Sequence, residues 1–228
     1  MTVIKNEGLR NFLRIAIPFV LIPSLALSGA IFFGEKSYAL VSVLSVLLTV
    51  VLFIAGYEKK MVGSRRAVLA AVMTALSVAG RFIPFFKPVT AITVLSGVYL
   101  GGETGLLVGA LSAVLSNFYF GQGPWTPFQM LAWGLTGLFA GYLSTILKKN
   151  RILIAGYGAV SGLVFSLVMD VWTVMWYNSG FDASLYLKAM VTALPHTIIY
   201  VVSNVVFLTL LAKPFGSKLE RIRTKYGV

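Results

Sequence analysis

Apolar residues fall in long blocks that short polar, glycine or proline stretches separate. A membrane-spanning helix needs roughly 20 mostly apolar residues. Nearly all of these blocks reach about that length, so the pattern predicts an all-α polytopic membrane protein. The fourth block is shorter, and we expect it to be tilted, curved or partly re-entrant beside a cavity. The eight predicted segments are 12–33, 37–56, 65–85, 88–101, 103–120, 125–147, 152–176 and 186–212.

The composition agrees with this prediction. Of the 228 residues 58% are hydrophobic and 11% are charged, whereas soluble proteins carry about 25% charged residues. The net charge of +12 could indicate nucleic acid, but its placement indicates a membrane orientation instead. With eight crossings, all 19 Lys and Arg except Lys36, Arg81, Lys87 and Lys188 lie on one side. Positive charge is enriched in cytoplasmic loops, so both termini are predicted to be cytoplasmic.

A short charged stretch, 57–64, is predicted to be a cytoplasmic linker between two parts. Residues 1–56 would form a two-helix transmembrane extension with an accessory or packing role, since no charge is expected inside it after Arg14. The basic start of the chain is typical of signal peptides too, but the apolar run is long, so we expect a retained helix. Residues 65–228 would form a six-helix substrate-binding membrane core.

Small residues recur every four positions at Ala67, Ala71, Ala75 and Ala79. On a helix this spacing produces a stripe along which another helix can approach closely. From the residues alone we favour packing inside this chain, and docking of another protein is the alternative. Glycines with the same spacing are expected to form a tight hairpin and an internal helix contact. They are Gly97, Gly101, Gly105, Gly109, Gly137 and Gly141.

Chemically reactive residues are scarce. The chain has no cysteine and one histidine, His196, which excludes thiol nucleophiles and zinc–thiolate sites. It also lacks the G-x4-G-K-[ST] phosphate loop. We therefore expect no catalytic residue, no metal and no cofactor. Two alternatives remain open: an ion- or proton-coupled secondary transporter with Asp170, Glu103 and His196 as relay, and a membrane enzyme, for which no adequate acid–base pair is present.

Three loops of the six-segment part are predicted to face outward, and all three combine aromatic rings with polar groups. These loops are 81–87, 117–126 and 172–178. Trp and Tyr also anchor helices at membrane interfaces, but the cytoplasmic connections lack this character. A shared outward-facing pocket explains the asymmetry. The predicted lining residues are Arg81, Asn117, Tyr119, Gln122, Trp125, Gln129, Trp172, Trp176 and His196.

Charged residues near these loops require partners. Arg81 either extends to lipid headgroups or points inward toward a ligand or Asp170. An unpaired charge within a membrane helix costs roughly 2.5–3.5 kcal/mol, so Asp170 is expected to have a partner or a wet cavity. Pro195 removes one backbone hydrogen bond and can kink the last segment beside His196.

The motifs of residues 65 to about 212 resemble the S-components of energy-coupling factor (ECF) transporters. The block N-F-x-F-G-Q-G-P-W-T-P at 117–127 is specific, and it most resembles the branch assigned to cobalamin. The extension at 1–56 departs from the usual six-helix pattern. The other matching motifs are R-R at 65–66, A-G-R-F-I-P at 79–84, F-K-P-V-T-A-I at 86–92 and W-G-L-T-G-L-F-A-G at 133–141.

This resemblance implies a substrate-binding subunit of an ABC-type vitamin importer in a prokaryotic plasma membrane. Its partners would be a scaffold membrane subunit and two ATPase subunits, which use ATP in place of this chain. The resemblance also assigns the alanine stripe from Ala67 to Ala79 to docking on the scaffold. The ligand is expected to be cobalamin or a related corrinoid, bound from outside before the subunit topples in the membrane. Riboflavin or a queuosine precursor would suit the same residues nearly as well.

Overall fold

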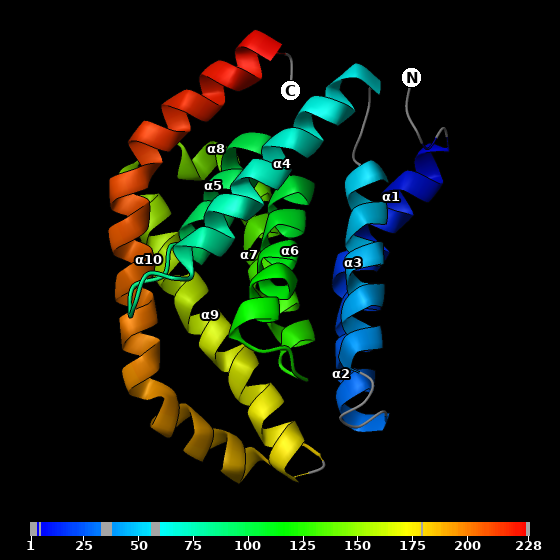
Figure 1. The fold of residues 1–228 in the computed structure, drawn as a ribbon, viewed down its shortest axis with the longest axis vertical. Coiled ribbons are helices and arrows are strands. Elements are labelled where there is room, and N and C mark those ends of the chain that lie inside the picture. Colours follow the sequence, from blue (N-terminus) through cyan, green and yellow to red (C-terminus); the bar gives the residue numbers. More distant parts are fainter. Residues whose placement is uncertain (1–3, 5, 33–37, 56–59, 179, 227–228) are drawn as a thin grey trace.

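The computed structural model describes residues 4, 6–32, 38–55, 60–178 and 180–226. The chain is a helical bundle (Figure 1), and no strand occurs among these residues. This confirms the predicted all-α class. A π-helical stretch, Ile17–Leu21, joins the first two helices. The α-helices are α1 (Glu7–Ala16), α2 (Ile22–Phe32), α3 (Tyr38–Ala55), α4 (Lys60–Gly80), α5 (Val89–Leu100), α6 (Gly102–Phe120), α7 (Thr126–Tyr142), α8 (Ser144–Leu147), α9 (Arg151–Asn178) and α10 (Ala183–Tyr226).

Every predicted segment is helical where it is described, and the differences lie at helix ends. Helix α4 begins at Lys60, so residues 60–64 of the predicted linker are helical, while 57–59 lie outside the described residues. Helix α10 continues to Tyr226, because Phe215 and Leu219 in its last turns pack against the main hydrophobic cluster. It also continues through Pro195 and Pro214, and it curves around the bundle (Figure 1).

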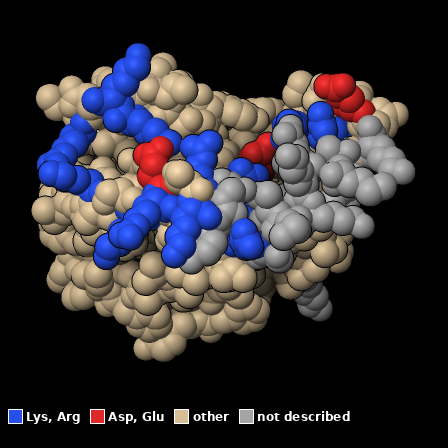
Figure 2. All heavy atoms as spheres, turned by 90° about the horizontal axis from the view of Figure 1, so that it is seen from above, with Lys and Arg blue, Asp and Glu red and all other residues tan. Residues whose placement is uncertain are grey.

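Both ends of the described chain lie at the same end of the bundle (Figure 1). Lys and Arg side chains gather on that end (Figure 2). This agrees with the prediction from the positive-inside rule, by which this end would face the cytoplasm. Four stretches are long and apolar enough to cross a membrane by length and composition, namely Glu7–Ile31, Tyr38–Ala55, Arg151–Asn178 and Ala183–Lys225. These features are those of a multi-pass membrane protein.

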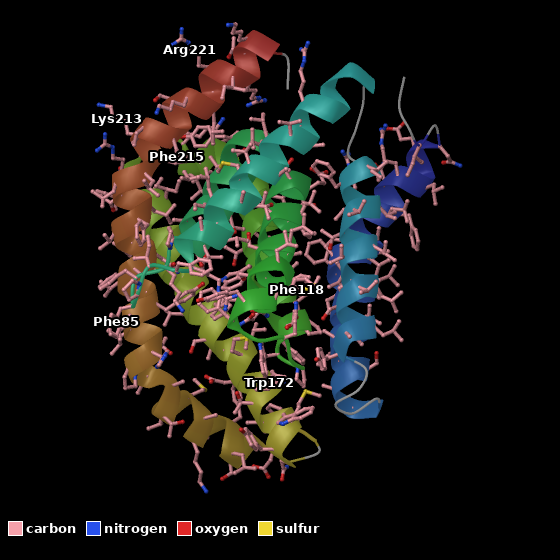
Figure 3. All side chains as sticks on the ribbon, in the orientation of Figure 1. Phe85, Phe118, Trp172, Lys213, Phe215 and Arg221 are labelled. Atoms are coloured by element: carbon pink, nitrogen blue, oxygen red, sulfur yellow. The ribbon has the colours of Figure 1, made fainter. Side chains whose placement is uncertain are left out.

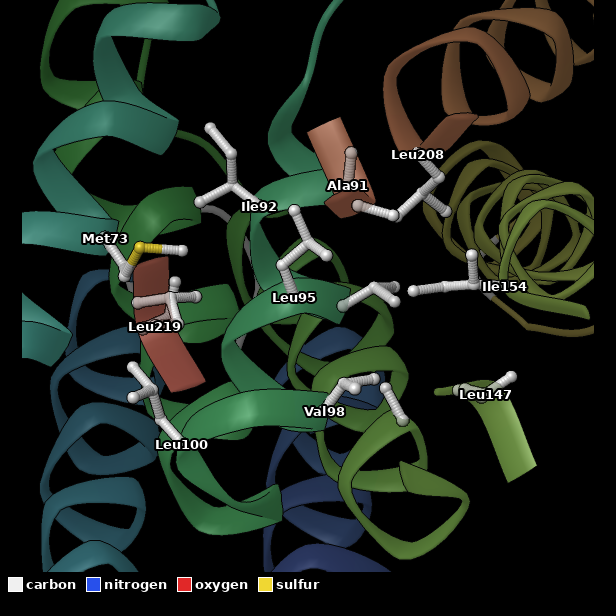
Figure 4. Close-up of a cluster of buried hydrophobic side chains, with 14 of the residues drawn as sticks. Met73, Ala91, Ile92, Leu95, Val98, Leu100, Leu147, Ile154, Leu208 and Leu219 are labelled. Carbon is white, nitrogen blue, oxygen red and sulfur yellow. The ribbon is translucent and has the colours of Figure 1, made fainter. Parts of the chain in front are cut away.

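The short helix α5 lies in the centre of the bundle. All of its residues except Tyr99 are buried, because α4, α6, α7 and α10 surround it. Its side chains, including Leu95 and Val98, belong to the main hydrophobic cluster (Figure 4). The sequence predicted that this segment borders a cavity. Instead it is enclosed by protein, and it lines neither of the two cavities described below.

Glycines allow α5, α6 and α7 to pack with their backbones in contact. A Cβ atom added to Gly137 would lie 2.4 Å from the carbonyl of Gly105, and one added to Gly141 would lie 2.3 Å from the backbone of Gly102. The predicted internal packing of Gly137 and Gly141 is therefore confirmed. Gly101, with φ of 103°, forms the tight turn between α5 and α6, as the spacing predicted.

The N-terminal helices pack on one side of α6 and α7. Ile17 and Leu52 form a cluster with Leu106 of α6 and Leu138 of α7. Arg14 also forms an ion pair with Glu103 at the start of α6, with 3.2 Å between Nε and Oε1. The hairpin is thus attached to the core by both apolar and charged contacts, and its accessory role stays a prediction.

Candidate binding site

An inner cavity of about 560 Å3 lies between the loop that follows α4 and helices α7, α9 and α10. Small-molecule sites in proteins usually measure about 300–1,000 Å3. Three of the nine predicted site residues line it, namely Arg81, Gln129 and His196. The loop supplies Arg81, α7 supplies Gln129, and α10 supplies His196 at an exposed position.

One wall of the inner cavity is a group of three aromatic rings. Phe165 of α9 stacks on Trp133 of α7, with ring centroids 5.1 Å apart and planes 16° apart. Its ring also lies 4.7 Å from that of Tyr200 on α10. The Tyr200 hydroxyl accepts a hydrogen bond from the Trp133 indole. It also forms a hydrogen bond of 2.7 Å with the Thr90 hydroxyl. Because the polar tips are satisfied within the protein, the ring surfaces are held in fixed positions.

Arg81 places a positive charge beside this wall. Its side chain is only 9% exposed, so it points inward rather than to lipid headgroups. The guanidinium donates hydrogen bonds to the Ser116 hydroxyl and to Asn117 Oδ1, the latter at 2.7 Å. It also lies over the rings of Phe120 and Trp133, at 4.8 and 5.2 Å from their centroids. Such contacts stabilise a cation away from water.

Asp170 is buried on α9 and lines the same cavity as Arg81. In the described part of the chain it forms no ion pair with Arg81 or any other residue. The sequence predicted either a charged partner or a cavity for this carboxyl. In the structure the Asp170 side chain lines a cavity. A polar cavity within the bundle lowers the cost of a charge at this depth.

Asn117 is almost fully buried and lies behind the inner cavity rather than on its surface. It accepts a hydrogen bond from Arg81 and donates to Thr126 Oγ1 at 2.8 Å and to Gln129 Oε1 at 2.9 Å. All of its hydrogen-bonding groups are thus used inside the protein. The prediction that Asn117 lines the pocket is wrong in this respect, because its amide holds Arg81 and Gln129 in place.

Four other predicted residues line a separate outer cleft of about 590 Å3. They are Gln122, Trp125, Trp172 and Trp176. Trp172 lies toward the end of the bundle away from the termini (Figure 3). The nine predicted residues therefore do not form one pocket, since the two cavities share no lining residue.

Tyr119 belongs to neither cavity. Its side chain is 72% exposed and contacts only the rings of Phe82, at 4.6 Å, and Phe120, at 5.1 Å, among the ring pairs of the described residues. This aromatic group on the surface matches the membrane-interface anchoring that Trp and Tyr commonly provide.

Many residues that line the inner cavity were not predicted from the sequence. They include Lys87, Trp133, Phe165, Ser166, Thr197 and Tyr200. One available signal was spacing. Ser166 and Asp170 are four residues apart on α9, as are His196 and Tyr200 on α10, and side chains at that spacing share a helix face. Two facing helices with paired polar positions would have indicated a cavity between them.

The predicted ion relay is not assembled. Asp170 and His196 line the inner cavity, but Glu103 lies in the first turn of α6, where it pairs with Arg14. A proton relay needs groups within hydrogen-bonding reach of one another or of a shared water. The pairing of Glu103 with Arg14 removes it from such a path.

Comparison with known families identifies the class of protein. The sequence model described as "ECF-type riboflavin transporter, S component" matches residues 61–220, which is well over half of the chain. No curated protein and no solved structure matches the chain. S-components of ECF transporters act with a scaffold subunit and ATPase subunits, and they are transport proteins rather than enzymes. The match does not extend to the cobalamin branch predicted from residues 117–127. The chain belongs to the ECF-type riboflavin transporter S-component family and is a substrate-specific membrane subunit of an ECF transporter.

Proposed function

We propose that the inner cavity binds a vitamin with a flat ring system, of which riboflavin is the leading candidate. The observation that carries this proposal is the fixed aromatic wall of Trp133, Phe165 and Tyr200 beside the buried cation Arg81. A conjugated ring can pack on such a wall and gain stacking energy of about 0.5–1.5 kcal/mol beyond the burial of its surface.

The polar groups of the cavity suit the edge of such a ring. Gln129 offers its amide N–H groups and Arg81 its positive charge as donors, while the Ser166 and Thr197 hydroxyls bond each other and the Ala193 carbonyl. An isoalloxazine ring carries carbonyl oxygens and ring nitrogens along one edge, which accept hydrogen bonds from these donors. Its ribityl chain carries hydroxyl groups that can donate to Asp170.

The volume of the cavity favours riboflavin over cobalamin. A cavity of about 560 Å3 suits a tricyclic ring with a short side chain. A corrinoid with its nucleotide loop is several times larger than riboflavin and would need the outer cleft as well. We therefore place cobalamin, which the sequence motif favoured, second to riboflavin.

Equilibrium titration of the purified full-length protein in detergent tests this proposal. The panel contains riboflavin, cobalamin and the queuosine precursor queuine. We expect sub-micromolar affinity for riboflavin and much weaker binding of the other two. Sub-micromolar affinity for cobalamin together with no measurable binding of riboflavin would contradict the proposal and support the corrinoid assignment.

We further propose that the alanine stripe docks on the ECF scaffold subunit. Ala67, Ala71, Ala75 and Ala79 are all exposed on α4, although packing within this chain was the interpretation favoured from the residues alone. Without neighbours in the chain, the stripe is free to receive a helix of another membrane protein at close distance. Its exposure in the isolated subunit supports the docking role.

A further inference from the structure

The outer cleft includes residues from the N-terminal hairpin. Tyr38 and Ala39, at the start of α3, form one wall, and the loop 122–125 forms another. Helix α9 supplies the rest of the lining through Trp172, Trp176 and Tyr177. The cleft thus lies where the extension meets the core, and without α3 it would be open on that side.

The chemistry of the outer cleft indicates a ring compound. The rings of Trp125 and Trp172 meet edge to face, with centroids 5.7 Å apart and planes 77° apart. The Trp172 indole N–H is buried and has no hydrogen-bond acceptor in the described part of the chain. A buried donor is nearly always paired in proteins. A ligand that packs against the rings would supply the missing acceptor through a carbonyl oxygen or ring nitrogen when the Trp172 ring turns to expose its enclosed N–H.

Hydrogen bonds connect the outer cleft to the inner cavity. Gln122 Oε1 accepts from the Thr126 hydroxyl at 3.0 Å, and Thr126 Oγ1 accepts from Asn117 Nδ2 at 2.8 Å. The same Asn117 amide donates to Gln129 and accepts from Arg81, both of which line the inner cavity. One hydrogen-bonded network therefore includes residues that line both cavities.

From these contacts we propose that the outer cleft is an entrance subsite, and that the N-terminal hairpin completes it. The flat vitamin would bind there first, against the Trp125–Trp172 pair, before it moves into the inner cavity. This inference rests on the proposed function, because it concerns the path of the same ligand. It gives the hairpin a part in substrate capture in place of the accessory packing role expected from the sequence.

Filling the cleft from the hairpin side tests the proposal. Stopped-flow fluorescence with riboflavin as the probe measures association and dissociation rates for the full-length protein. Ala39→Trp is expected to lower both rates by about tenfold and to leave Kd unchanged, because a block on the path slows entry and exit equally. Val43→Trp is the matched control: Val43 lies one turn further along α3, is 56% exposed and does not line the cleft.

Trp172→Phe tests the unpaired donor. An aromatic ring remains, smaller than the indole, but the N–H is lost, so the association rate of riboflavin is expected to fall about threefold. Wild-type rates in both Ala39→Trp and Trp172→Phe, with riboflavin bound normally, would overturn the entrance subsite alone. Absence of riboflavin binding to the wild-type protein would contradict the proposed function instead, and this inference with it.

Discussion

Replacing Ala71 or Ala75 by Leu is expected to abolish vitamin uptake while the affinity of the subunit for the vitamin stays unchanged. Both alanines are exposed on α4, so a larger side chain does not disturb the core of this chain. Each Leu adds three carbon atoms to a surface where close helix approach depends on small residues. The scaffold helix would be held away, and the coupling to ATP hydrolysis would be lost.

The measurement needs both transport and binding. Uptake is followed in proteoliposomes that contain the variant with the scaffold and ATPase subunits, and affinity is measured on the isolated subunit. Ala183→Leu is the matched control, because it adds the same atoms at an exposed position at the start of α10. Normal assembly and uptake in the Ala71→Leu and Ala75→Leu variants would rule out the docking surface.

Asn117→Ala is expected to weaken vitamin binding about a hundredfold. Its amide is the shared partner of Arg81, Thr126 and Gln129, so its removal leaves a buried cation and two buried polar groups less well paired. Loss of a hydrogen bond to a charged group costs about 1.5–3 kcal/mol. A loss of about 2.7 kcal/mol in binding free energy raises Kd about a hundredfold. Asn117 acts as a positioning residue, so the effect reaches the ligand through Arg81 and Gln129.

A general loss of stability would also follow from removing a buried amide, and Asn204→Ala separates the two effects. Asn204 is fully buried and donates to the Gly158 carbonyl at 3.1 Å, between α9 and α10. It does not line the inner cavity. We expect both variants to lower the melting temperature in detergent, but only Asn117→Ala to lower the affinity. Equal affinities in the two variants would refute the positioning role.

The helices could be predicted because apolar blocks of membrane length have few alternative structures. Helix ends were harder to predict. Nothing in the charged stretch after residue 212 shows that α10 continues through Pro214, and the tertiary contacts of that helix decide the outcome. The enclosure of α5 was equally hidden, since a short apolar segment has the same composition whether protein or lipid surrounds it.

The binding site could be predicted only in part, for a specific physical reason. Sequence shows that Asn117 and Gln129 are polar within an apolar region, but not whether they face a ligand or each other. In the structure Asn117 bonds Gln129 and Arg81, and only the latter two reach the cavity. Trp133 carried no distinguishing sign, because aromatic residues are common in buried helices.

The motif at 117–127 contributes little to the walls of the inner cavity. Among its residues, Asn117 and Thr126 form the buried network, while Gln122 and Trp125 line the outer cleft. The walls of the inner cavity come mainly from α9, α10 and Trp133. A motif that builds the support of a site can be similar in proteins whose ligands differ.

Mass spectrometry of the ligand that copurifies with the full-length protein tests most directly whether the inner cavity holds a flat ring vitamin. The comparison is between the wild type and Ala193→Trp, whose new ring would fill the cavity from α10. The account predicts an equimolar riboflavin-class vitamin in the wild type and none in the variant. A corrinoid in the wild type, a ligand without a conjugated ring, or equal retention by both proteins would contradict it.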